Sequence, residues 1–119
     1  MEEQFREATV EEQEQWIDAN GRPYPQFRQD VRQAMLADGW VMTHQDGEAD
    51  FFAKGRVLLY AAPSDGLIDP PPHRIVIFRF PSEAARFRNE AETDIDDERP
   101  ALYREHDVAA ALHRANGLV

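Results

Sequence analysis

Residues 74–80 read RIVIFRF, the densest run of β-forming side chains in the sequence. Five of these seven residues are apolar and either β-branched or aromatic. Prolines at positions 70–72 precede the run and Pro81 follows it, so both ends are marked by residues that interrupt a sheet. Near-continuous apolar character is typical of a strand buried on both faces, and we predict that this run is a central strand.

The preceding sequence predicts two helices and three strands that cover this strand or pair beside it. A capping box at Thr9 and Glu12 predicts a short first helix that ends at Asn20-Gly21. Residues 25–37 carry apolar side chains at helical spacing and predict a second helix, which Asp38-Gly39 ends. Turn signals then separate three strands, predicted over residues 40–44, 49–53 and 56–62.

The following sequence predicts two more helices. Ser82 is the expected N-cap of a third helix. A last helix is expected between Pro100 and Asn116, and Asp107 offers an alternative N-cap for a shorter helix from Val108. The pattern leaves both alternatives open, and it places Gly117 just past the end of the helix.

These elements have the order α-α-β-β-β-β-α-α and predict a single α+β domain over residues 1–119, with residues 1–8 frayed. Hairpin connections imply a mostly antiparallel sheet of about four strands, covered by helices. A chain of 119 residues can bury roughly two-thirds of the surface that it exposes when unfolded. The expected core includes Trp40, Leu58, Ile75, Ile77 and Phe78.

The composition excludes several classes of site. The sequence contains no cysteine, which excludes disulfides, thiolate metal sites and cysteine catalysis. Met1 is followed by two glutamates, whereas a secretory signal begins with basic residues and continues with an apolar run. No apolar stretch approaches membrane-spanning length. We therefore expect a soluble, cytoplasmic protein without a membrane partner.

The net charge restricts the partners. The formal charge is −10 and the pI is near 4.7, so the protein surface as a whole repels nucleic acid. We therefore expect no direct nucleic-acid partner. The same charge suits a protein with a basic surface, although excess acid also serves solubility alone. Nothing in the sequence argues against a homodimer.

The strongest local charge is an acidic run without a basic residue, which we predict to be the partner-binding segment. Its acidic residues are Glu90, Glu92, Asp94, Asp96, Asp97 and Glu98. A calcium loop of the EF-hand type needs a central glycine, and this run has none. We expect no metal and no cofactor here, and the alternative to partner binding is a solvated helix end.

A second polar series, His44, Asp46, Glu48 and Asp50, alternates as side chains on one strand face would. Histidine and carboxylates together are metal-ligand chemistry. Gly47 lies inside the series and predicts a turn, so the series is interpreted as a polar hairpin tip. The sequence contains no nucleophile elbow, phosphate-binding glycine loop or zincin motif, and we predict no catalytic residue.

Residues 27–44 read FRQDVRQAMLADGWVMTH and resemble the start of the XisH family of excision-controlling factors. In that family an amphipathic helix ends in Asp-Gly-Trp and the next strand ends in Thr-His. The resemblance implies a fold like that of PD-(D/E)xK nucleases, with catalytic acids on later strands. The corresponding residues 57–62 and 75–80 carry no acid, so the resemblance implies a nuclease-like fold without its metal site.

Residues 78–85 look like the strand-to-helix corner of small dimeric α+β barrel proteins. That resemblance implies a small enzyme or ligand-binding protein with a pocket between sheet and helices, which is the alternative function. Size and charge instead favour a binding protein without chemistry of its own. An inhibitor, immunity or anti-defence protein of a bacterium or phage, acting on a basic protein, would fit.

Overall fold

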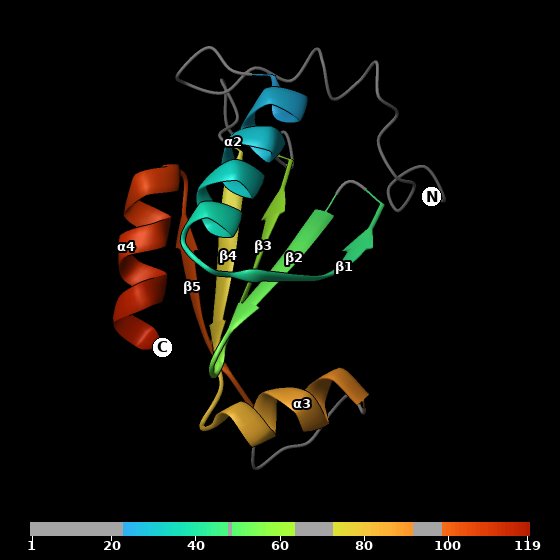
Figure 1. The fold of residues 1–119 in the computed structure, drawn as a ribbon, viewed down its shortest axis with the longest axis vertical. Coiled ribbons are helices and arrows are strands. Elements are labelled where there is room, and N and C mark those ends of the chain that lie inside the picture. Colours follow the sequence, from blue (N-terminus) through green and yellow to red (C-terminus); the bar gives the residue numbers. More distant parts are fainter. Residues whose placement is uncertain (1–22, 48, 64–72, 92–98) are drawn as a thin grey trace, which may run out of the picture.

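Three helices and an antiparallel sheet of five strands make up the part of the chain that the computed structural model describes, residues 23–47, 49–63, 73–91 and 99–119 (Figure 1). The α+β class is confirmed. In chain order the elements are α2 (Tyr24–Ala37), β1 (Val41–Asp46), β2 (Ala49–Lys54), β3 (Val57–Ala62), β4 (Arg74–Arg79), α3 (Glu83–Ala91), β5 (Ala101–Glu105) and α4 (Val108–Leu118). The predicted first helix and the predicted frayed residues 1–8 lie outside the described residues.

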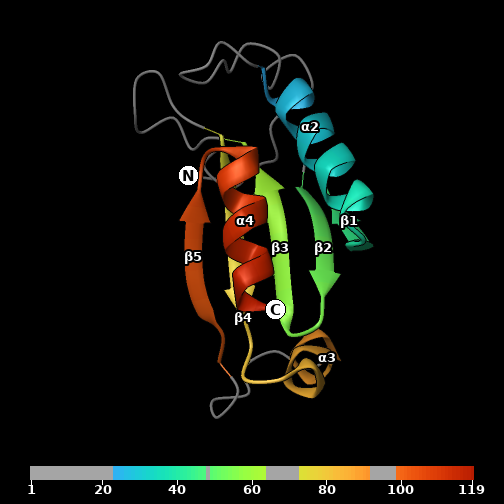
Figure 2. The same ribbon diagram turned by 60° about the vertical axis from the view of Figure 1, so that its left-hand side comes forward.

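The sheet is a meander in which each strand pairs with its neighbours in sequence, in the order β1-β2-β3-β4-β5 (Figure 2). Gly47 and Gly55 both adopt a φ of 58°, which allows the tight turns that join β1 to β2 and β2 to β3. The strand built on residues 74–80 is β4, and it has a partner on each side, as predicted. The middle strand is β3, because a fifth strand lies beyond β4.

That fifth strand corrects the predicted order, which had no strand between the third and the last helix. Residues 101–105 pair with β4 along its length, with Tyr103 opposite Ile77. The shorter alternative for the last helix is right, because the Asp107 side chain accepts a hydrogen bond from the Ala110 N–H at 2.9 Å. Gly117 lies inside α4, not past its end.

Helix α2 begins between two prolines and ends at Ala37, and Gly39 follows it with a φ of 87°, the left-handed conformation expected of a glycine just past a helix end. Its fully buried side chains recur every three to four residues and face the sheet. They are Tyr24, Phe27, Val31 and Met35.

Helices α2 and α4 both cover the same face of the sheet (Figure 2). The fully buried side chains of Phe52, Leu59, Ile75 and Ile77 lie in the core between this face and the two helices. Trp40 is 2% exposed, which confirms its predicted place in the core. The core prediction is wrong for Phe78, because alternation along β4 places its partly buried ring on the opposite face from Ile77.

Helix α3 lies at one end of the sheet, against the face that α2 and α4 leave uncovered (Figure 1). The predicted cap is confirmed, since Ser82 Oγ accepts a hydrogen bond from the Ala85 N–H at 3.0 Å. Ala85 packs with Ala53, Leu58 and Phe80. No described helix is long and apolar enough to cross a bilayer.

Candidate functional site

The candidate site is the face of the sheet that points away from α2 and α4, which we call the open face. Four side chains cross it in a row, one from each of four adjacent strands: His44, Phe51, Tyr60 and Phe78. Successive ring centroids are 4.2, 5.0 and 5.8 Å apart, and the rings are stacked. Side chains from neighbouring strands meet in this way only where they share one face.

An irregularity in β1 completes the row. The register shifts between Met42 and His44, so that Met42 pairs with Phe52 and His44 pairs with Phe51. A β-bulge of this kind re-aims the side chains that follow it. Here it brings His44 to the open face, stacked on Phe51.

Other apolar side chains extend the row toward both edges of the sheet. Leu102 on β5 is 51% exposed and lies opposite Phe78, and Val41 on β1 is 64% exposed. Between Val41 and the exposed Phe87 of α3 runs a groove of about 420 Å³, which Ala53 also lines. Partly exposed rings together with exposed aliphatic side chains on one face are typical of a binding surface.

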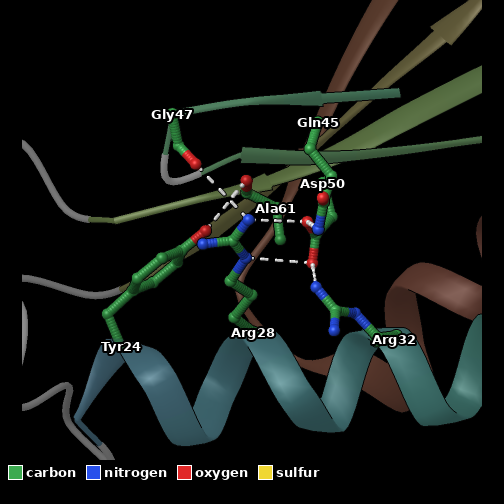
Figure 3. A network of polar contacts seen from close by, with 7 residues as sticks. All are labelled: Tyr24, Arg28, Arg32, Gln45, Gly47, Asp50 and Ala61. Carbon is green, nitrogen blue, oxygen red and sulfur yellow. Dashed lines mark hydrogen bonds and ion pairs between the residues drawn. The ribbon is translucent and has the colours of Figure 1, made fainter. Parts of the chain in front are cut away.

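The opposite side of the sheet carries a buried polar cluster around Asp50 (Figure 3). Arg28 makes a two-pronged contact with its carboxylate, through Nε at 3.0 Å and Nη2 at 2.7 Å. Arg32 donates from Nη2 at 2.8 Å, and Gln45 donates from Nε2 at 3.0 Å. The two arginines are four residues apart on α2, and Gln45 is the cross-strand partner of Asp50, so local geometry brings all three together.

Asp50 is ionised in this cluster. Burial raises the pKa of its carboxyl, but the hydrogen bonds from Arg28, Gln45 and Arg32 outweigh burial and hold the pKa at about 2. Both carboxylate oxygens are occupied by these donors. The cluster therefore ties α2 to the β1–β2 hairpin and offers no free base for chemistry.

This cluster corrects the interpretation of the His44 series as a polar hairpin tip. Asp46 is exposed at the turn and His44 belongs to the open face, but Asp50 is fully buried on the other side. Arg28 and Arg32 of α2 pack over Asp50 and are only partly exposed. The signal in the sequence was the spacing of these two arginines, because residues four apart lie on the same side of a helix.

A second polar cluster joins three elements that are distant in sequence. Asn116 of α4 donates to the Asp38 carboxylate at 2.7 Å, across 78 positions, and Lys54 of β2 approaches the same oxygen at 3.3 Å. The hydrogen bond from Asn116 is the main cause that lowers the pKa of Asp38. The cluster fixes α4 beside the end of α2.

The predicted partner-binding run is only partly within the described residues. Glu90 lies in the last turn of α3. The other five acids, Glu92, Asp94, Asp96, Asp97 and Glu98, lie outside the described residues. The run starts where α3 ends, at one edge of the open face, and the described chain resumes at Arg99 ahead of β5.

Charge is distributed unevenly along the sequence. Residues 92–98 contain five acidic residues and no basic residue, so this segment alone contributes −5 of the formal net charge of −10.

Within the described ranges, no group of three or more His, Asp or Glu side chains is placed to hold a metal ion. His73 is fully buried between the rings of Tyr24 and Phe27, at centroid distances of 5.4 and 5.3 Å. His106 Nδ1 lies 3.1 Å from the carbonyl oxygen of His73. His73 is thus held by ring packing, and His106 by a contact with the backbone.

Comparison with known protein families, with curated proteins and with solved structures found no match.

Proposed function

We propose that this protein is a binding protein without chemistry of its own, and that another protein docks on its open face. The observation that carries the proposal is the row of stacked rings on that face, extended by exposed Leu102 and Val41. Aromatic side chains dominate the energetics of protein interfaces because they bury much area and lose little conformational entropy. An inhibitor, immunity or anti-defence role suits such a surface.

The partner that fits has an apolar patch with basic residues beside it. The apolar patch would cover Phe51, Tyr60 and Phe78, while the basic residues would meet the acidic run that begins at the end of α3. Complementary charge mainly accelerates encounter and selects the partner. A second copy fits less well, because it would bring its own charge of −10.

The alternative of a pocket between sheet and helices has less support. The side chains in that layer, including Phe27, Phe52 and Leu59, are fully buried and packed against one another. His44 and Tyr60, which would line such a pocket if they pointed inward, are on the open face. The arrangement favours binding at a surface over binding in an interior cavity.

A single-stranded nucleic acid is a second candidate partner, because stacked rings on a sheet can also receive bases. Arg104 is exposed on β5 beside this face. The overall charge of −10 opposes a polyanion at long range, so we favour the protein partner. Fluorescence anisotropy with a labelled single-stranded oligonucleotide separates the two, and tight binding of that oligonucleotide would overturn the protein proposal.

Substituting Leu102 by glutamine tests the open face with little risk to the fold. The chain offers a matched control in Leu36, which is 49% exposed on α2, against 51% for Leu102 on the open face. We expect Leu102→Gln to weaken binding of the purified partner about tenfold, which corresponds to about 1.4 kcal/mol. Leu36→Gln should leave the affinity unchanged.

The measurement begins with crosslinking and capture from an extract of the native host and ends with titration calorimetry on the purified partner. Equal affinities for wild type, Leu102→Gln and Leu36→Gln would place the interface elsewhere. Light scattering, which measures the mass in solution, tests the remaining possibility that a second copy of the chain occupies the open face. A dimer that Leu102→Gln dissociates would assign the face to a second copy.

The acidic run has its own test. Replacing Asp94, Asp96, Asp97 and Glu98 by the matching amides removes four charges and should leave the melting temperature nearly unchanged. Association with the partner should slow several-fold at low salt, and the difference should shrink as salt shortens the Debye length to about 8 Å. Stopped-flow kinetics at two or more salt concentrations measures this. A rate that stays unchanged at low salt would make the run a solubilising surface.

A further inference from the structure

A pocket of about 320 Å³ lies at the end of the sheet where β4 leads to α3 and β5 begins. Its described lining consists of Arg56, Arg79, Phe80, Pro81, Arg99 and Ala101. Three of these six residues are arginines and none is an acid. A pocket of this size is at the lower end of the range for small-molecule sites.

The fold holds the first two arginines in place. Arg56 lies in the turn before β3, where its Nε donates to the Leu118 carbonyl oxygen at 3.0 Å. Its own carbonyl oxygen accepts from the Phe80 N–H at 2.9 Å, which binds the turn to the end of β4. Arg79 is the last residue of β4 and pairs with Val57 and Ala101 on the neighbouring strands.

The Nε of Arg79 is buried and has no hydrogen-bond partner among the described residues. A buried donor without a partner is unfavourable, so the polar contacts of Arg79 are incomplete. The guanidinium groups of Arg56 and Arg79 also line one small space and repel one another. An oxyanion in the pocket would relieve this repulsion, since it carries the opposite charge and accepts hydrogen bonds from guanidinium groups. The planar fork of arginine matches the oxygens of a phosphate group.

We propose that this pocket binds a small phosphate monoester. Arg56 and Arg79 hold the phosphate, with Arg99 at the exposed rim, and the organic part lies against Phe80 and Pro81. A phosphate monoester is close to a dianion at neutral pH, so it balances the two guanidinium groups of Arg56 and Arg79, where a carboxylate balances one. The site lies at the end of the sheet, beside the open face, and its occupation does not depend on the proposed protein partner.

The test is an NMR titration of the full chain with phenyl phosphate, inorganic phosphate and acetate, each at the same ionic strength. We expect phenyl phosphate to shift the backbone amides of residues 56, 79, 80 and 101 with one binding site, inorganic phosphate to bind more weakly there, and acetate to bind weakest. Arg79→Gln should weaken phenyl phosphate binding at least tenfold. Arg88→Gln, the same change at an exposed α3 residue outside the lining, should bind as the wild type does.

Arg79→Lys keeps the charge and removes the fork, so it separates charge from geometry. Weakened binding in Arg79→Lys, with an unchanged melting temperature, supports the bidentate contact. Equal shifts with acetate and both phosphates, or equal binding by Arg79→Gln and Arg88→Gln, would overturn the proposal. Binding that appears only after the acids of residues 92–98 are replaced by amides would also overturn it, because the pocket would then serve the carboxylates of the chain itself.

Discussion

Replacing Asp50 by asparagine is expected to lower the free energy of unfolding by about 3 kcal/mol. The amide keeps the shape of the side chain and removes the charge that two guanidinium groups share. Breaking a buried ion pair from one side typically costs 3–5 kcal/mol, because a charge is left without its partner. The lower end applies here, since the Arg28 and Arg32 side chains are 22% and 39% exposed and regain some hydration.

The pH dependence checks the origin of this loss. The folded-state pKa of Asp50, about 2, lies below the ordinary value of 3.8. The stabilisation is therefore complete above pH 3.8 and disappears as pH falls toward 2. The unfolding free energies of wild type and Asp50→Asn, obtained from urea melts, should differ by the full amount at pH 6 and converge as the pH approaches 2.

Asp46→Asn provides the matched control, because Asp46 is exposed on the same hairpin. That variant should change the unfolding free energy by less than about 0.5 kcal/mol at pH 6. A loss under 1 kcal/mol for Asp50→Asn, or a loss that does not depend on pH, would contradict the described cluster.

Replacing Ile77 by alanine is expected to cost about 2–5 kcal/mol. Ile77 is fully buried in β4 and lies between Leu59 and Tyr103 on the flanking strands. Truncation leaves a cavity under α2 and α4 that packed neighbours fill only in part.

Leu36→Ala is the control for this measurement, because a side chain of similar size is removed from a site that is 49% exposed. Denaturant melts should show a change of under about 1 kcal/mol there. An equally small change for Ile77→Ala would mean that β4 is not an internal strand.

Much of the fold follows from signals that act over a few residues. The capped ends of α2 and α3, and the glycine turns at positions 47 and 55, were predictable because backbone conformation and side-chain hydrogen bonds decide them locally. Strand β5 was not predictable in this way. Its five residues, Ala101–Glu105, become a strand by pairing with β4, more than twenty positions earlier.

The candidate site was harder to predict from the sequence than the fold was. The burial of Asp50 depends on two arginines from α2 that lie above it, and alternation along β2 alone cannot reveal them. The position of Phe78 required knowing which face of β4 the helices cover. The bulge that brings His44 to Phe51 leaves no glycine or proline as a signal.

The meander topology has a consequence for the folding kinetics. Every strand pairs with its neighbour in sequence, so ladder formation requires the closure of short to moderate loops and the relative contact order of the sheet stays low. The contact between Asp38 and Asn116, across 78 positions, instead requires the last helix to dock on the completed sheet. During synthesis the hairpins can therefore form as they leave the ribosome, while the core under α4 closes only after residues 108–118 have emerged.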